Sequence, residues 1–150
     1  MDGHDASKIT LRRLSADDEE RLVAASPLFD GPVTPELARH FLRRPGHHLL
    51  LAENAEGASV GFVSGVETTH PDKGTEMFLY ELGVAEPWRR RGVASRLIAA
   101  LADIARERGC YGMWTGTESD NEAALATYRA TGAEIEPGTT IVVYNFPSGG

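Results

Sequence analysis

The feature that most constrains the fold is a basic, glycine-containing turn, RRRGVAS at residues 89–95. It follows a strand-like run at residues 77–84 and opens an amphipathic helix, whose apolar residues recur at three- and four-residue steps. The first backbone amides of a helix lack intrahelical partners and carry partial positive charge. The pattern predicts a turn that binds a phosphate group, with arginines adding donors. The alternative is a solvated basic turn in which Gly92 only eases the chain reversal.

The remaining hydrophobic pattern predicts alternating strands and helices in a single domain over residues 8–146. Residues 1–7 read as a disordered tail and residues 147–150 as a frayed end. Helices are expected from Ser15, from Pro35 and from Val93, the last ending at Gly109. A further helix is expected over residues 122–131 and ends at Gly132. Strands are expected at residues 9–14, 48–52, 60–66, 76–84, 113–117 and 140–146.

Composition limits the classes of function. The chain has 150 residues, of which 41% are hydrophobic and 25% charged, as is ordinary for a globular protein. No apolar run approaches the roughly 20 residues that cross a bilayer, and the polar N-terminus lacks a signal-peptide layout. We therefore expect a cytoplasmic protein without membrane contact. A net charge of −7 argues against a nucleic-acid partner and favours a cationic small substrate, although the acidic balance can also serve solubility alone.

The single cysteine, Cys110, excludes an internal disulfide and fits a reducing compartment. It follows the predicted helix end at Gly109, which favours a buried residue at the entry to a strand. A catalytic thiol is the alternative. We expect no covalent route through this residue.

The order strand, two helices, three strands, helix, strand, helix, strand, with the pattern Arg-x-x-Gly-x-Ala after the fourth strand, resembles the GNAT superfamily of acetyl-CoA-dependent N-acetyltransferases. The pattern is matched by Arg89, Gly92 and Ala94, and Asn121 and Tyr128 fall where the family has a second cofactor-side motif. The dinucleotide and P-loop glycine patterns do not occur. The resemblance implies an α/β (α+β) fold with a mixed, mostly antiparallel central sheet, flanked by helices and splayed at the cofactor strand.

The resemblance implies acetyl-CoA as co-substrate and no metal. Main-chain groups of Leu82, Gly83 and Val84 would pair with the pantetheine arm. A glycine within a strand also indicates a bulge or a close backbone approach, or only accommodates packing. The pyrophosphate would be bound by the turn, that is, by Arg89, Arg90, Arg91, Gly92, Val93, Ala94 and Ser95.

Two residues seven positions apart, Asn121 and Tyr128, can face one groove from the same helix. Tyr128 is the candidate general acid, because a phenol with a pKa near 10 can give a proton to the departing thiolate. A half-buried core aromatic is the alternative for Tyr128, and helix capping is the alternative for Asn121.

The candidate base is Glu81, which precedes the cofactor segment and turns away from the core if Leu82 packs into it. Partial desolvation would raise the pKa of such a carboxyl toward neutrality. The alternative is a cross-strand salt bridge. Further acidic candidates for holding a cationic substrate are Asp120, Glu118 and Glu67. Metal or catalytic roles are not expected for His47, His48 and His70.

The segments at residues 78–85 and 89–97, with Leu28 and Phe29 upstream, look like the aminoglycoside 3-N-acetyltransferases of this superfamily. The resemblance implies direct acetyl transfer to an aminoglycoside amine, the 3-amino group, with Phe29 and Glu81 among the substrate-binding residues. Antibiotic resistance is the role associated with that activity, and the sequence leaves the native role open. A homodimer is common in the family. The alternatives are acetylation of a protein N-terminal amine, a lysine or a polyamine, and, in another class, a non-catalytic acyl-CoA-binding sensor.

Overall fold

The computed structural model describes residues 3–147 of the chain, which forms two compact units, Met1–Gly116 and Thr117–Gly150. The described part of the second unit, residues 117–147, contains one helix, α4 (Glu122–Ala130). The first unit contains the sheet and, in chain order, η1 (Ala6–Lys8), β1 (Thr10–Arg13), η2 (Ala16–Asp18), α1 (Glu19–Ala24), η3 (Ser26–Leu28), α2 (Pro35–Arg43), β2 (His47–Glu53), β3 (Ser59–His70), β4 (Gly74–Val84), η4 (Glu86–Trp88), α3 (Val93–Glu107) and β5 (Met113–Trp114).

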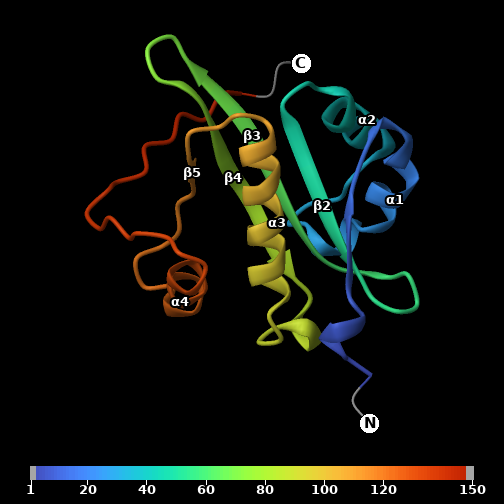
Figure 1. The fold of residues 1–150 in the computed structure, drawn as a ribbon. Helices are drawn as coiled ribbons and strands as arrows, with labels where there is room; N and C mark the ends of the chain where they lie inside the picture. The colour runs from blue at the N-terminus through green and yellow to red at the C-terminus, as the bar shows by residue number, and fades with distance from the viewer. Residues whose placement is uncertain (1–2, 148–150) are drawn as a thin grey trace. The chain divides into compact units, whose positions relative to one another are not determined.

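The sheet has the order β1-β2-β3-β4-β5 (Figure 1). The first four strands pair antiparallel, and β5 pairs parallel to β4. Such a parallel pair requires a crossover connection, which α3 supplies. The mixed, mostly antiparallel sheet predicted from the sequence is therefore confirmed.

Both faces of the sheet are covered within the first unit. Gly61 and Gly65 of β3 face α3, which lies in front of β3 and β4 in Figure 1. The opposite face packs on α1 and α2 through a buried cluster of Leu22, Ala25, Ala38, Leu49, Leu51 and Phe62. Because strand side chains alternate between faces and both faces are covered, β2 and the first half of β3 carry nearly continuous runs of buried residues.

The helix starts follow the local sequence. The Ser15 hydroxyl accepts from the Asp17 amide at 3.4 Å, and the Asp18 carboxylate accepts from the Ser15 amide at 2.8 Å, so a capping box opens the first helical segment. The Thr34 hydroxyl accepts from the Leu37 amide at 3.2 Å and caps α2, with Pro35 at its first position. These two predicted starts are confirmed.

The prediction of a strand at residues 140–146 is wrong, because this segment has no strand in the structure. Its apolar side chains are exposed, Tyr144 by 78% and Phe146 by 84%. A β-branched run becomes a strand only when a neighbouring backbone accepts its hydrogen bonds, and sequence periodicity does not report whether such a neighbour is in place. The expected strand at 113–117 is likewise shorter, Met113–Trp114.

The N-terminal segment is more ordered than predicted. Residues 6 and 7 of the expected tail belong to η1, together with Lys8, and the Asp5 carboxylate caps this segment. The Arg96 guanidinium on α3 donates to the Ala6 carbonyl at 3.1 Å and to the Ile9 carbonyl at 3.0 Å. These contacts attach the segment to α3. Residues 1–2 and 148–150 of the predicted ends lie outside the described residues, and the single domain over 8–146 stays a prediction.

Candidate functional site

The turn before α3 has the backbone geometry of an anion site. Arg90 and Gly92 have left-handed φ angles of 63° and 80°. No side chain caps the helix, and the first amide to bond within it is that of Arg96, which donates to the Gly92 carbonyl at 3.1 Å. The amides of Val93, Ala94 and Ser95 therefore begin the helix without carbonyl partners in it. Turn and helix-start amides of this kind bind phosphate oxygens.

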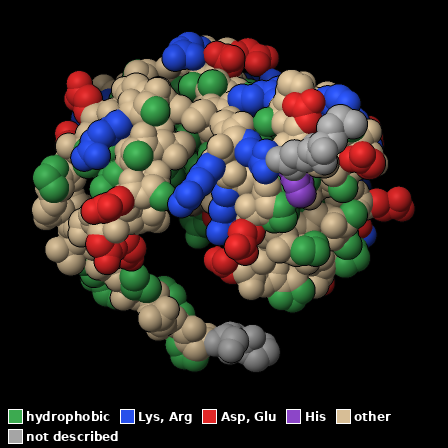
Figure 2. Space-filling model, turned by 90° about the horizontal axis from the view of Figure 1, so that it is seen from below, with side chains coloured by type: hydrophobic (Ala, Val, Ile, Leu, Met, Phe, Trp, Pro, Cys, Tyr) green, Lys and Arg blue, Asp and Glu red, His purple; other side chains and the backbone are tan. Residues whose placement is uncertain are grey.

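The arginine side chains of the turn are exposed, and two of them also hold its shape. Arg89 donates through Nε to the Val84 carbonyl at 3.0 Å, and Arg91 donates through Nε to the Pro87 carbonyl at 3.0 Å. Trp88, only 6% exposed, anchors the preceding η4. The turn lies at the lower end of Figure 1, and Figure 2 shows Lys and Arg side chains gathered on that end. Local charge here is opposite in sign to the net charge of the chain.

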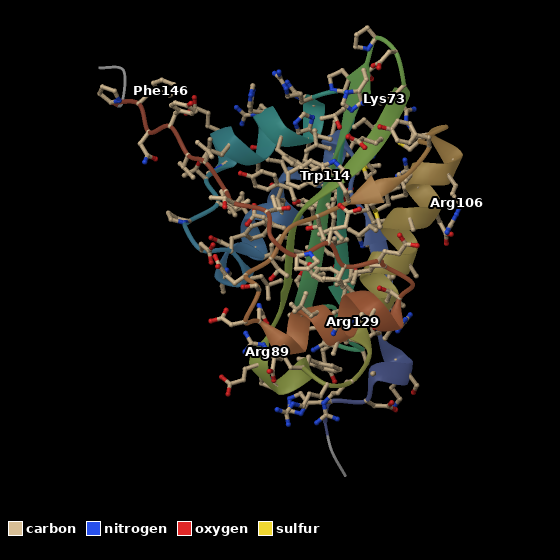
Figure 3. All side chains as sticks on the ribbon, turned by 90° about the vertical axis from the view of Figure 1, so that its left-hand side faces the viewer. Lys73, Arg89, Arg106, Trp114, Arg129 and Phe146 are labelled. Atoms are coloured by element: carbon tan, nitrogen blue, oxygen red, sulfur yellow. The ribbon has the colours of Figure 1, made fainter. Side chains whose placement is uncertain are left out.

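The sheet is splayed between β4 and β5. The two strands pair only at Met77–Met113 and Phe78–Trp114, after which the Thr115 hydroxyl donates to the Leu79 carbonyl at 2.8 Å. Strand β4 continues to Val84, whereas β5 ends at Trp114. In Figure 3, Trp114 lies part of the way along the sheet, and Arg89 lies beyond the end of β4. The splay predicted for the cofactor strand is therefore present.

Main-chain groups of β4 alternate between its two edges. The Ala85 amide donates to the Val60 carbonyl at 2.8 Å, so the main-chain groups of Ala85 point toward β3. Because the direction alternates along a strand, the main-chain groups of Gly83 point toward β3 as well. Leu82 and Val84 then present their main-chain groups to the splayed edge, where Arg89 already engages the Val84 carbonyl. An extended ligand at this edge would pair with Leu82 and Val84 rather than with Gly83.

Gly83 is required by packing. A β-carbon there would lie 2.7 Å from Cε1 of Phe62 and 3.3 Å from the Leu28 carbonyl oxygen. The bulge of β4 lies elsewhere, since Ser64 pairs with Glu81 and Gly65 with Leu79, which leaves Tyr80 as the extra residue. The predicted close backbone approach and packing at Gly83 are confirmed, and the predicted bulge at this residue is wrong.

Glu81 lies on the face of β4 opposite α3, because its pair partner Ser64 lies on that face with Phe62. The Ser64 hydroxyl accepts from the Glu81 amide at 3.2 Å and replaces the main-chain bond that the bulge disrupts. Desolvation by burial, and secondarily the nearby Asp30 carboxylate, raises the pKa of Glu81 above its ordinary value. This is the pKa direction expected for a base, and the described contacts include no salt bridge to this carboxylate.

Two residues predicted to contact the substrate have partners within the first unit, and their predicted roles stay predictions. The Phe29 ring stacks on Phe62 with centroids 4.0 Å apart, packed against the α1–α2 core. Glu67 accepts from His48 at 2.7 Å and from Arg108 at 3.0 Å, so its charge is already paired. Neither feature was visible in the sequence, because both contacts join segments far apart in the chain.

His47, His70 and Cys110 have surroundings that fit a role in holding the fold. His70 contacts the Glu76 carboxylate at 2.9 Å, and His47 contacts the Pro45 carbonyl at 3.3 Å. Burial, together with the charge of Glu67, raises the pKa of the Cys110 thiol, which disfavours the thiolate needed for nucleophilic attack. Within residues 3–147 no group of three or more acidic, histidine or cysteine side chains could hold a metal ion.

In the second unit, Asn121 caps α4, and its side-chain oxygen accepts from the Ala124 amide at 3.1 Å. The capping alternative for Asn121 thus holds. Tyr128 lies two turns along the same helix and is half-buried. Glu118 and Asp120 lie in the exposed segment before the helix. The roles predicted for these four residues stay predictions.

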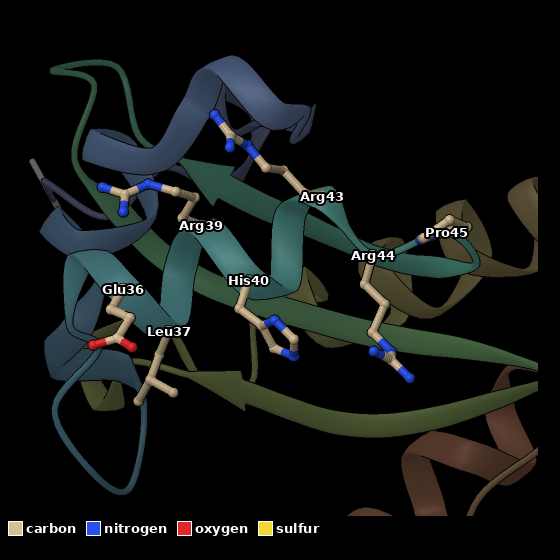
Figure 4. Close-up of a pocket in the computed structure, with 7 residues that line it drawn as sticks. All are labelled: Glu36, Leu37, Arg39, His40, Arg43, Arg44 and Pro45. Atoms are coloured by element: carbon tan, nitrogen blue, oxygen red, sulfur yellow. The ribbon is translucent and has the colours of Figure 1, made fainter.

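An open depression lies on α2, away from the predicted site residues (Figure 4). Leu37, His40 and Arg44 point from one side of the helix, and Arg39 and Arg43 from the other. Arg39 pairs with Glu19 at 2.8 Å. Because the side chains diverge, the depression offers no convergent set of groups for a ligand.

Sequence reasoning missed Asp30, Tyr80 and Trp114. The bulge at Tyr80 has no reliable sequence signal. Tyr80 and Trp114 lie in predicted strands, and nothing in the sequence gives either aromatic residue a role. Asp30 could have been singled out as an acidic residue next to Phe29, but its proximity to Glu81 depends on how the η3 loop lies against β4.

The first unit thus combines a free strand edge, where β4 runs beyond β5, with an uncapped helix start and a basic turn. The acetyltransferase (GNAT) family model matches residues 11–133. The chain belongs to this family, and it is an acetyl-CoA-dependent N-acetyltransferase.

Relatives in the family have diverse acceptors. An uncharacterized N-acetyltransferase, YycN of Bacillus subtilis, is 32% identical over 70% of this chain and 67% of its own length. The L-2,4-diaminobutyric acid acetyltransferase of Halomonas elongata is 33% identical over 85% of this chain and 66% of its own length. The N-alpha-acetyltransferase RimI of Mycobacterium tuberculosis is 30% identical over 85% of this chain and 80% of its own length. The chain spans about two thirds of the length of the first two.

Solved structures share the fold. An aminoglycoside acetyltransferase from an uncultured soil metagenomic sample, crystallised with sisomicin, superposes with a TM-score of 0.85 over 94% of this chain and 98% of that one, at 19% identity. Among sequence relatives, an aminoglycoside N(6')-acetyltransferase of Serratia marcescens is 32% identical over 65% of this chain and 70% of its own length. The predicted 3-N specificity is not confirmed by these relatives.

No helix among residues 3–147 combines the length and the apolar character that a membrane crossing demands. The predicted cytoplasmic location stays a prediction.

Proposed function

We propose that the protein transfers the acetyl group of acetyl-CoA directly to a primary amine of a small, multiply charged cation, with an aminoglycoside as the leading candidate. The observation that supports this most is the position of Glu81, a partly desolvated carboxylate on the face opposite α3, two residues beyond the last contact between β4 and β5. The predicted 3-amino position and a resistance role are part of the same proposal.

The residues present fit acetyl-CoA. The unpaired edge of β4 offers main-chain groups of Leu82 and Val84 to an extended arm. The uncapped amides of α3, with the exposed arginines of the turn, suit a pyrophosphate. When bound, acetyl-CoA supplies the acetyl thioester. We assign Arg90 and Gly92 to phosphate binding, and we retain Asn121 as a predicted cofactor contact.

Proton transfer is assigned to this chain's own side chains. An ammonium must lose a proton before its nitrogen can bond to the acetyl carbon, and Glu81 takes that proton directly or through water. As the carbon–sulfur bond breaks, Tyr128 donates its phenolic proton to the departing sulfur. Glu118 and Asp120 are proposed to attract the cationic acceptor, because several carboxylates focus a multivalent cation.

The test is free-thiol release from acetyl-CoA with aminoglycosides, diamino acids, polyamines and N-terminal peptides, followed by mass spectrometry of the products. Glu81→Gln should lower kcat/KM about 10²- to 10⁴-fold at neutral pH. The matched control is Glu56→Gln, which changes an exposed carboxylate in the β2–β3 turn and should leave the rate unchanged. Full activity in Glu81→Gln would remove the base from this proposal.

The main competing acceptor is a peptide N-terminus, which the 30% identity to RimI favours. Turnover on peptides alone would replace the small-molecule acceptor while keeping the family chemistry. Acetyl-CoA binding without turnover on any amine would instead favour an acyl-CoA sensor, in which Glu81→Gln and Tyr128→Phe change nothing. A homodimer stays a prediction, which sedimentation of the purified protein would test.

A further inference from the structure

Three aromatic side chains form a continuous cluster where β4 and β5 separate. The Phe78 ring stacks on Trp114 with centroids 4.3 Å apart and an interplanar angle of 23°. Tyr80 meets the edge of Phe78 at 5.5 Å and 84°. The two outer rings remain open to solvent, since Tyr80 is 62% and Trp114 is 51% exposed. Large aromatics of a folded core are normally covered, so a stacked and uncovered group indicates a binding surface.

The β-bulge places this cluster on the same face as the candidate base. Phe78 pairs with Val66 and Glu81 pairs with Ser64, two residues away on β3, so both side chains lie on the face opposite α3. In a regular strand the odd spacing between Phe78 and Glu81 would put them on opposite faces, and the bulge at Tyr80 absorbs one residue so that they share a face. The bulge therefore joins an aromatic surface to a carboxylate.

The charge beside the rings is negative. Asp30, in the loop after η3, is close enough to Glu81 to raise the pKa of that carboxyl. The backbone of the same segment reaches β4, because the Leu28 carbonyl oxygen lies 3.3 Å from where a β-carbon of Gly83 would be. Carboxylates next to exposed aromatic faces repel anions and attract cations. This charge selects a cation as the occupant.

We infer that Tyr80, Trp114 and Asp30 form an ammonium-binding subsite for the acceptor, in which the rings contact the cation by cation–π interaction and Asp30 supplies opposite charge. The inference rests on the proposed function and names the residues that select its substrate. Trp gives the strongest cation–π contact of the side chains, and Trp114 belongs to the last β4–β5 pair. A cation on these rings lies at the mouth of the splay, next to Glu81.

The subsite should prefer a cation over a neutral molecule of the same shape. Choline and 3,3-dimethyl-1-butanol differ in charge at nearly equal size, so they separate cation–π binding from simple apolar contact. Tryptophan fluorescence reports binding without any catalysis, because Trp114 is half exposed and the other tryptophan, Trp88, is buried. We expect saturable quenching with choline and none with the alcohol at equal concentration. Equal quenching by both, or none by either, would overturn the inference.

Variants locate the subsite, with choline affinity measured by ligand-observed NMR. Trp114→Leu keeps apolar area but loses the ring, and it should weaken binding about threefold to thirtyfold. Trp114→Phe should retain affinity within about threefold, and its remaining fluorescence should no longer respond. Asp30→Asn should weaken binding as well. The control is Tyr111→Phe, at an exposed tyrosine whose hydroxyl donates to Glu76, and it should change nothing. Unchanged affinity in Trp114→Leu, with native circular dichroism, would refute the assignment.

The same variants separate failure of this inference from failure of the proposed function. With an accepted amine as substrate, Trp114→Leu should raise the acceptor KM by the same factor and leave the acetyl-CoA KM unchanged. An unchanged acceptor KM would overturn the subsite while acetyl transfer stands. Choline binding lost in Trp114→Leu, in a protein that acetylates no amine, would support the cation site and overturn the proposed function.

Discussion

The contact between β3 and α3 leaves no room for a side chain at Gly65, and replacing this glycine by alanine should measurably destabilise the protein. A β-carbon there would lie 2.8 Å from Cδ1 and 3.0 Å from Cδ2 of Leu101, and 2.9 Å from Sδ of Met77. Carbon atoms pack best at about 3.5–4.0 Å. Both neighbours are fully buried, so neither can swing into solvent. We expect Gly65→Ala to cost about 1–3 kcal/mol.

A double-mutant cycle tests whether this crowding is the cause. Leu101→Ala alone should cost about 2–5 kcal/mol, because it removes a fully buried side chain and leaves a cavity. It also removes two of the three atoms that obstruct the new β-carbon. The double variant, Gly65→Ala with Leu101→Ala, should therefore cost less than the sum of the single variants, by about 1–2 kcal/mol.

The assay is urea unfolding followed by circular dichroism, analysed as the free energy of unfolding. The control is Gly112→Ala, where an added β-carbon meets no atom within 4 Å and the glycine does not need a left-handed backbone. It should be neutral or slightly stabilising, since alanine restricts the unfolded chain. Strict additivity in the cycle, or a neutral Gly65→Ala, would refute the packing argument.

Four further outcomes are expected. Glu53→Gln should lower the free energy of unfolding by about 2–3 kcal/mol at neutral pH, because the buried carboxylate accepts from Arg12 at 2.8 Å and from Arg21 at 2.7 Å. Burial alone would raise the pKa of Glu53, but these bonds lower it. The difference in unfolding free energy between wild type and variant, measured in urea, should therefore disappear as pH falls through the acidic range. Glu81→Gln should leave stability at pH 7 unchanged or higher. The raised pKa of Glu81 makes the wild-type free energy of unfolding fall as pH rises from the unfolded-state pKa of this carboxyl to its folded-state pKa. A variant that is less stable than wild type in thermal unfolding would contradict this expectation. Gly92→Ala should cost about 1 kcal/mol for the left-handed φ of 80° and weaken acetyl-CoA binding in calorimetry, whereas unaltered affinity would argue against the phosphate turn. Tyr128→Phe should lower kcat with little change in acetyl-CoA affinity, and an unaltered turnover number would remove Tyr128 as the acid.

The sequence by itself was enough for features that depend on local pattern. The helix of α3 follows from apolar residues at three- and four-residue steps, and its start follows from Gly92 next to the arginines. The capped starts at Ser15 and Thr34 follow from hydroxyl side chains that satisfy helix amides nearby in the chain. Even the facing of Glu81 away from α3 could be predicted, because alternation relative to Leu82 is a property of the strand itself.

The tertiary structure decided everything that depends on a partner distant in the chain. Residues 140–146 have a strand-like composition but no strand, because a strand exists only through hydrogen bonds to a neighbour. Glu67, a predicted substrate contact, accepts hydrogen bonds from His48 and Arg108, and both of these partners lie far from it in the chain. The bulge at Tyr80 brings the aromatic rings to the face of Glu81, since register arises from pairing with β3 and not from β4 alone.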